Sequence, residues 1–148
     1  MILHEKKRKF VKDHLAKRGN KSIEVTERHV RNWWGVLNIA VFYGKLNKPK
    51  IVTVRKLKGC WGTADDFKIS REEHKRGVRY VNIEIHHEFV SRKMFLDTLV
   101  HEMVHAWEYQ FHTVMGHGKR FFAWKDRIKR TVSLDLDNGQ SVEEYIDG

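Results

Sequence analysis

Hydrophobic and polar positions recur with two different periods along this chain, and each period predicts a different kind of element. In residues 26–43 the apolar side chains recur every three or four residues, which is the helical repeat. They are Val30, Trp33, Trp34, Leu37 and Val41. Thr26 is a suitable N-cap for this helix and Gly44 a suitable end. The spacing accounts for the two tryptophans as core residues better than as a binding surface.

A period of two follows this helix and indicates strands. The segment IVTVRKL after Pro49 alternates and is rich in β-branched residues, and VRYVNIEI, Val78 to Ile85, alternates most cleanly. Another strand is expected within GCWGTADDFKIS, entered through Gly59 and Gly62. The segment REEHKRG between the last two strands is expected to be a turn.

The second half of the chain returns to helical spacing. Ser91 can cap one helix, and a further helix is expected from about Gly118 to about Thr131. Leu134 and Leu136, in the acidic tail, can add a short strand. The order helix, three strands, helix, helix predicts an α+β fold, with a small antiparallel three-stranded sheet packed against an N-terminal helix and the helix capped by Ser91.

Charge and composition narrow the class of protein. The 148 residues, 41% hydrophobic and 32% charged, suit a globular chain that needs no disulfide to fold. We divide it into a basic N-terminal arm, residues 1–21, and a single domain, residues 22–148. The arm has eight basic side chains against Glu5 and Asp13. Three interpretations remain open for it: docking on the domain, binding phosphates, or forming a solvated terminus.

The net charge of +10 favours polyanionic partners, of which nucleic acid is the commonest. Cys60 is the only cysteine, so an intramolecular disulfide and a CxxC metal knuckle are both excluded. This favours a reducing, cytoplasmic compartment. The chain has neither a bilayer-spanning stretch nor a signal-peptide core, so we expect a soluble protein without a membrane partner.

Four of the ten histidines lie between Leu99 and Phe121, and three of them can reach one point in space. His101 and His105 are four residues apart, so on a helix both imidazoles can face the same ion. Glu102 lies about 100° further round the axis, where it is poorly placed as a ligand but well placed beside a water on that ion. This HExxH spacing supports metal-assisted hydrolysis.

His117 is the third candidate ligand, because it lies between Gly116 and Gly118 and a glycine-flanked turn can fold back over the helix. Three protein ligands with an open fourth position form the arrangement of catalytic zinc. The metzincin pattern is excluded, since Glu108 and Phe111 stand where it needs a glycine and a histidine. The alternative is that the histidines are core or surface residues with local hydrogen bonds.

The HExxH helix carries a polar stripe on an otherwise apolar surface. Asp97, His101, His105 and Glu108 form this stripe, at spacings of four, four and three. Buried polar groups need partners, and a metal ion would supply one. Glu108 or Asp97 can orient a ligand histidine, or Glu108 can simply meet solvent near the helix end.

The stretch LDTLVHEMVHAWEY followed by GHGKRFFAW resembles the SprT-like metallopeptidases, the family that includes the Spartan protease domain. The matching features are TL-x-HEM-x-HA at Thr98 to Ala106 and HG-x-x-F at His117 to Phe121, and the similarity covers about residues 24–132. The resemblance implies a zincin-like, zinc-dependent protease with three histidine ligands and a glutamate general base. In this family proteolysis is often linked to DNA, including the removal of proteins cross-linked to it.

Two departures from this family define the form that the chain resembles. Many relatives carry a C-terminal zinc ribbon or another DNA-binding part, and a chain with one cysteine has no such ribbon. The segment between the second and third histidines is also short. The chain thus resembles the compact stand-alone SprT-like proteins of bacteriophages, for which the host cytoplasm is the expected location.

Two further sets of site residues are predicted. The strand Val78 to Ile85 is expected beside the cleft, where Tyr80, Asn82 and Glu84 would contact an extended substrate strand. The alternative is an ordinary core strand. The basic residues expected to contact nucleic acid are Lys6, Lys7, Arg8, Lys9, Lys119, Arg120 and Lys125. The alternative for these is that they cover ordinary solvated helix faces.

Two functions therefore remain open from the sequence. The first is a zinc-dependent (Zn²⁺) endopeptidase that uses a metal-activated water, with Glu102 as general base, on protein or peptide substrates that include DNA-associated proteins. The second is a non-enzymatic nucleic-acid-binding or interaction protein with a structural metal site. Glu102 favours the first, because a structural site needs no carboxylate there. Three imidazoles suit zinc among the divalent ions.

Overall fold

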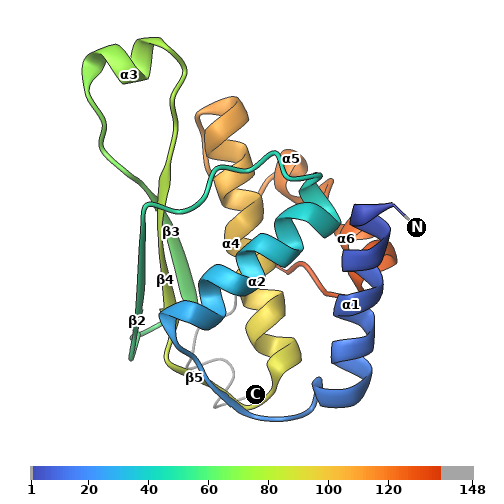
Figure 1. The fold of residues 1–148 in the computed structure, drawn as a ribbon. Coiled ribbons are helices and arrows are strands. Elements are labelled where there is room, and N and C mark those ends of the chain that lie inside the picture. The colour runs from blue at the N-terminus through green and yellow to red at the C-terminus, as the bar shows by residue number, and fades with distance from the viewer. Residues whose placement is uncertain (1, 138–148) are drawn as a thin grey trace.

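The computed structural model describes residues 2–137, in which helices pack against one side of a small sheet (Figure 1). Helices and small sheets make this an α+β fold, as the sequence predicts. The elements are α1 (Leu3–Arg18), β1 (Ile23–Glu24), α2 (Glu27–Phe42), β2 (Ile51–Arg55), β3 (Gly62–Asp66), α3 (Arg71–Lys75), β4 (Val81–His86), β5 (Glu88–Phe89), α4 (Arg92–His112), α5 (Lys119–Phe122) and α6 (Lys125–Val132). None of the described helices is long and apolar enough to cross a membrane.

Helix α2 begins at the predicted cap. The Thr26 side chain accepts a hydrogen bond from the His29 backbone amide, and the Thr26 amide donates to Nδ1 of the His29 ring. This reciprocal pair is a capping box with histidine in the place usually held by a glutamate. The helix is followed by Gly44 at φ 76°, a left-handed conformation that suits glycine. Trp33 and Trp34 are both buried in the core, as predicted.

The main sheet is mixed in direction and has the strand order β2-β4-β3, so the prediction of an antiparallel sheet is wrong. β4 pairs in parallel with β2 and antiparallel with β3. The burial of β4 explains its central place, because its apolar residues Val81, Ile83 and Ile85 are all buried. The sequence GTADD of β3 has no large apolar residue and takes an edge position.

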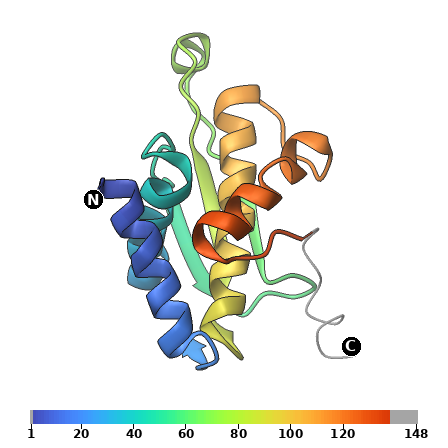
Figure 2. The same ribbon diagram turned by 90° about the vertical axis from the view of Figure 1, so that its right-hand side faces the viewer.

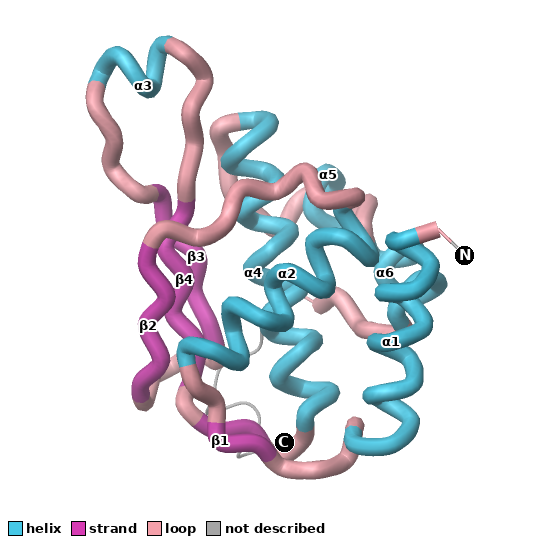
Figure 3. The backbone as a smooth tube through the Cα atoms, viewed as in Figure 1, coloured by secondary structure: helices cyan, strands magenta, loops and turns pink. Residues whose placement is uncertain are grey.

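Two predicted boundaries also differ. The expected turn REEHKRG contains the short helix α3, because Ser70 and Glu73 form a second capping box. The expected helix from Gly118 to Thr131 is divided into α5 and α6. Trp124 lies at this break and packs its ring against Phe42 and Trp107. Figure 3 shows α3 at the far end of a long connection between β3 and β4, well away from the helical layer.

The segment after α6 is irregular where a short strand is predicted. Leu134 and Leu136 are nevertheless almost fully buried, and the Asp135 backbone amide donates to the Asp97 side chain instead of to a strand. A side-chain acceptor thus replaces the strand partner that the alternating pattern suggests. The remainder of the predicted tail, residues 138–148, lies outside the described residues.

Residues 3–18 of the basic arm form α1, which packs against α2 and α6 (Figure 2). Val11 is fully buried in this contact. Arg8 also joins the two helices, since its Nε donates to the Ala40 carbonyl oxygen at 2.8 Å and its guanidinium lies over the Tyr43 ring. The helical stripe of the arm therefore docks on the domain.

Candidate metal centre

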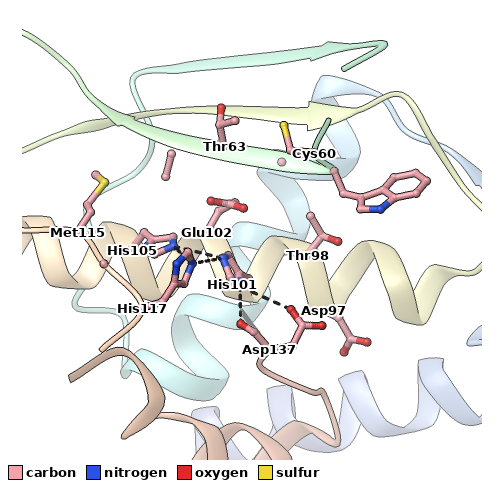
Figure 4. Close-up of a pocket in the computed structure, with 14 residues that line it drawn as sticks. Cys60, Thr63, Asp97, Thr98, His101, Glu102, His105, Met115, His117 and Asp137 are labelled. Carbon is pink, nitrogen blue, oxygen red and sulfur yellow. Dashed lines mark hydrogen bonds and ion pairs between the residues drawn. The ribbon is translucent and has the colours of Figure 1, made fainter. Parts of the chain in front are cut away.

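Helix α4 presents the HExxH motif at the wall of a cavity of about 410 Å³. The helix begins at Ser91, whose side chain accepts a hydrogen bond from the Met94 amide as predicted. Leu99 and Met103 are fully buried on its core side. His101 and His105 face the cavity, whose opposite wall is the segment from residue 60 to residue 64, which includes the first half of β3 (Figure 4).

The structure brings the three predicted histidines together at one point. His101 and His105 come from α4, and His117 comes from the loop between α4 and α5. Their Nε2 atoms lie 3.2 Å apart between His105 and His101, and 3.1 Å from His117 to each of the others. A tetrahedral zinc ion with bonds of about 2.0–2.1 Å separates its ligand atoms by about 3.3–3.4 Å. The three side chains are therefore close enough to bind one metal ion.

The hydrogen bonds made by the Nδ1 atoms of His101 and His105 explain why the Nε2 atoms of these rings can act as metal ligands. His101 Nδ1 lies 3.0 Å from the Asp137 carbonyl oxygen, and His105 Nδ1 lies 3.1 Å from Glu108 Oε1. Both oxygens only accept hydrogen bonds, so each Nδ1 carries the proton and each Nε2 presents a lone pair. Burial lowers the pKa of His101 to about 3, which keeps the ring neutral. A cation satisfies these convergent lone pairs, so the donor set fits a metal ion.

The remaining members of the polar stripe have different partners. Glu108 is buried and orients His105, and it also accepts a hydrogen bond from the Gly116 amide at 3.2 Å. Asp97 forms no hydrogen bond with His101 or His105; its carboxylate accepts from Lys93 at 2.8 Å and from the Asp135 amide at 2.8 Å. Of the two candidates for orienting a histidine directly, the structure therefore selects Glu108.

Glu102 lies between the histidine cluster and β3, with 5% of its surface exposed (Figure 4). Burial raises the pKa of Glu102 to about 8, and the nearby negative charge of Asp65 acts in the same direction. A cation held by the adjacent histidines would favour the ionised carboxylate and oppose this shift. Metal binding at the three histidines and ionisation of Glu102 would therefore favour each other.

Gly62 of β3 sets the space available to the Glu102 carboxylate. A Cβ atom at Gly62 would lie 3.0 Å from Thr98 Cγ2, 3.2 Å from Glu102 Oε2 and 3.2 Å from Ile85 Cδ1. These distances are shorter than an ordinary van der Waals contact, so a side chain at this position must displace a neighbour. The sequence predicts Gly62 only as the entrance to a strand, whereas in the structure it lies against the carboxylate of the proposed base.

If the cavity hydrolyses peptides, as the sequence resemblance implies, we expect Gly62→Ala to lower the rate of hydrolysis by about tenfold or more, because a small displacement of a catalytic group is costly. Metal affinity should change little, since none of the three atoms nearest to the added Cβ belongs to His101, His105 or His117. Hydrolysis rate and zinc content, measured on the same preparation, check this. Gly35→Ala in α2 is the matched control, because a Cβ there meets nothing within 4 Å. Equal activity of both variants would contradict a role for the space at Gly62.

The predicted substrate residues do not lie where they were expected. β4 is paired on both sides, so it has no free edge for a substrate strand. Tyr80, Asn82 and Glu84 do not line the cavity, and Glu84 instead pairs with Arg55 at 2.8 Å. The strand beside the cavity is β3. Its five residues, GTADD, lack the apolar alternation that identified β4, so the pattern pointed to the wrong strand.

The predicted nucleic-acid contacts fall on two surfaces. On α1, Arg8 and Lys9 both have partners within the fold. Arg8 donates hydrogen bonds to the Ala40 carbonyl oxygen of α2 and to the Tyr43 hydroxyl at the end of that helix, and Lys9 pairs with Asp13 at 2.7 Å. Arg8 and Lys9 also line a groove between α1 and α6, together with Lys12 of α1 and Arg130 of α6. Lys6 is exposed on α1 and Lys7 is half-buried there; the residues exposed on α5 and at the start of α6 are Lys119, Arg120 and Lys125.

Phe121 completes the packing around the three histidines. It is fully buried, and its ring centroid lies 4.8 Å from that of His101, 4.7 Å from that of His105 and 5.0 Å from that of His117. Phe121 belongs to the segment from about Gly118 to about Thr131 that the sequence predicts to be helical. In the structure the buried Phe121 ring packs against all three histidine rings and so forms the apolar support of the cluster.

The model of the SprT-like family matches residues 30–144, a segment that includes most of α2, the three-stranded sheet, α4 and all three histidines. No curated protein matches the chain. The family match therefore includes the whole histidine cluster and Glu102.

Proposed function

The chain belongs to the SprT-like family, and from this membership and its histidine cluster we propose that it is a zinc-dependent endopeptidase. The observation that carries the proposal is the convergence of three Nε2 atoms within 3.2 Å, beside a buried glutamate in one cavity. Three protein ligands leave one position for a reactant, whereas a structural zinc site normally fills all four with protein. This favours catalysis over the alternative of a structural metal site.

The proposed roles follow from position. His101, His105 and His117 would hold the zinc ion, which when bound lowers the pKa of a water molecule and polarises the scissile carbonyl group. Glu102 would accept a proton from the attacking water and deliver one to the leaving amine. Its burial excludes competing solvent, and Gly62 leaves the carboxylate room beside the cavity. Glu108 would keep His105 in the tautomer that offers Nε2.

We propose that an extended peptide substrate pairs with β3. Within residues 2–137, β3 has one neighbouring strand, β4, so its other edge is available for strand addition. Gly62, Thr63 and Ala64 of β3 line the same cavity as the histidines. A peptide on this edge would therefore place its backbone beside Glu102.

DNA-associated proteins are the substrate class that the surface charge supports. Lys119 and Arg120 are exposed and follow the proposed ligand His117 by two and three residues. A phosphate backbone on this surface would lie close to the cavity, and its affinity would fall steeply as salt concentration rises. DNA bound there would bring its own bound proteins to the site.

Incubation of the purified full chain with casein and with a DNA-bound protein tests the proposal. We expect zinc-dependent cleavage of both, with DNA and low salt increasing the cleavage of the second, and complete loss of cleavage after chelation. Zinc content is measured in parallel. A chain that retains zinc at its three histidines and cleaves neither substrate would overturn the proposal and favour the structural site.

A further inference from the structure

His101 takes the hydrogen-bond partner that fixes its ring from a distant part of the chain. Its Nδ1 lies 3.0 Å from the backbone carbonyl oxygen of Asp137, 36 residues later. That carbonyl belongs to residues 133–137, an irregular segment after α6 that we call the C-terminal strap. A backbone carbonyl stays in place only if its own segment is held, so the position of the His101 ring depends on the contacts that hold the C-terminal strap.

Two apolar anchors hold the strap against the helical layer. Leu134 is 0% exposed and Leu136 is 1% exposed. They alternate with Asp135 and Asp137, whose side chains are about half exposed. Burial of the two leucines fixes which face of the strap meets the protein, but apolar contacts are non-directional and do not set the position of one carbonyl oxygen.

A polar network supplies the missing direction. Asp97 Oδ1 accepts from the Asp135 backbone amide at 2.8 Å, and Asp97 Oδ2 accepts from Lys93 Nζ at 2.8 Å. Lys93 Nζ also lies 2.6 Å from Asp135 Oδ2, and Lys129 of α6 lies 3.0 Å from Asp135 Oδ1. Charge-assisted hydrogen bonds are the stronger and more directional class. Asp135 is thereby joined to both α4 and α6, two residues before the carbonyl that meets His101.

Asp97 lies one helical turn before His101 on α4. The helix therefore carries both the first ligand and the group that fixes the strap. A closed path results, from Asp97 to the Asp135 amide, along two residues to the Asp137 carbonyl, and from there to the His101 ring. Figure 4 shows Asp97 and Asp137 beside His101, on the side of the histidine cluster away from β3.

We propose that Asp97 is a positioning residue of the metal centre, which acts on His101 through the C-terminal strap. The inference rests on the proposed metal site and adds a residue and a backbone segment to it. Loss of Asp97 frees the Asp135 amide, lets the Asp137 carbonyl move, and leaves the orientation and tautomer of His101 less well fixed. Outer partners of this kind typically change metal affinity by about 10–100-fold.

Cobalt binding to the full chain tests this without any need for catalysis. Affinity is measured by competition with a chromophoric chelator, and ligand geometry by the visible absorption of bound Co²⁺. We expect Asp97→Ala to weaken Co²⁺ binding by about 10–100-fold and to alter the absorption bands. Asp97→Asn keeps an oxygen that can accept from the Asp135 amide, so it should restore most of the affinity and the wild-type spectrum.

Three comparisons make the test specific. Asp135→Ala removes the two lysine contacts and keeps the backbone amide, so an intermediate loss of affinity is expected. Glu108→Ala removes the direct partner of His105 and gives the size of effect that losing an imidazole partner produces. Asp13→Ala is the matched control, because it breaks an exposed ion pair with Lys9 on α1 and should leave Co²⁺ binding unchanged.

Circular dichroism establishes which variants are folded. Wild-type affinity and spectrum in folded Asp97→Ala would overturn the inference. If Asp97→Ala does not fold, Asp97→Leu takes its place, because leucine is of similar size and has no acceptor for the Asp135 amide. Wild-type affinity and spectrum in that variant would overturn the inference. A wild-type chain that binds Co²⁺ but cleaves no peptide would overturn the proposed function alone, whereas one that binds no Co²⁺ would overturn both.

Discussion

Replacement of Glu102 by glutamine is expected to lower the rate of peptide hydrolysis by at least about 100-fold while zinc affinity stays near the wild-type value. General acid–base groups typically contribute about 10²–10⁴-fold to the rate. Glutamine has the size and shape of glutamate and fits the same buried space beside Gly62, but it cannot accept the proton. The measurements are casein cleavage and zinc content, made on the same preparation of the full chain.

The control for this experiment is Glu88→Gln. Glu88 lies on the two-residue strand β5 and is exposed, so the variant loses a negative charge without touching the cavity. Wild-type activity is expected from it. Full activity in Glu102→Gln would exclude Glu102 as the base, and a loss of zinc together with activity would show that Glu102 acts on metal binding instead.

Removal of the metal is expected to abolish hydrolysis and to lower the thermal stability of the chain by several degrees. A ligand that binds only the folded state at about 100 times its dissociation constant adds about 2.7 kcal/mol to the free energy of unfolding. For a chain of this size, each kcal/mol shifts the melting temperature by about 2–4 °C. The three nitrogens converge only in the folded chain, because His117 comes from a separate loop. Thermal unfolding with and without zinc measures the effect.

His105→Ala gives the matched comparison for metal removal. This variant should unfold at the same temperature with and without zinc, because two of the three converging pairs of nitrogens include His105. His87→Ala removes a half-exposed histidine outside the cluster and should keep the full zinc response. A zinc response in His105→Ala equal to that of the wild type would mean that zinc stabilises the chain from another site.

The sequence was sufficient wherever structure is decided locally. The cap at Thr26, the apolar stripe of α2 and the cap at Ser91 all appear as predicted, because capping and helical periodicity depend on residues three or four positions apart. The direction of the sheet was not predictable in this way. β4 inserts between β2 and β3, and this choice depends on packing between segments about 30 residues apart.

The site residues also differ in whether local spacing or tertiary packing brings them together. The i, i+4 spacing and the glycines around His117 were enough to bring three histidines together, because helix geometry fixes two of them. Asp137 lies 36 residues after His101, so no local spacing in the sequence could have identified it; its backbone carbonyl oxygen lies 3.0 Å from His101 Nδ1, and its side-chain Oδ1 lies 4.0 Å from the same nitrogen. Gly62 and the edge position of β3 depend on tertiary packing in the same way.

The exposure of His117 bears on how an ion is taken up. His101 and His105 are buried and already aligned on a rigid helix, whereas His117 is exposed, and its loop is joined to α4 where the Gly116 amide bonds to Glu108. For the proposed metal site we therefore expect loading in two stages, in which His101 and His105 take up the ion first and His117 joins it afterwards. The exchange rate should then depend on opening of this short loop and not on unfolding of the domain.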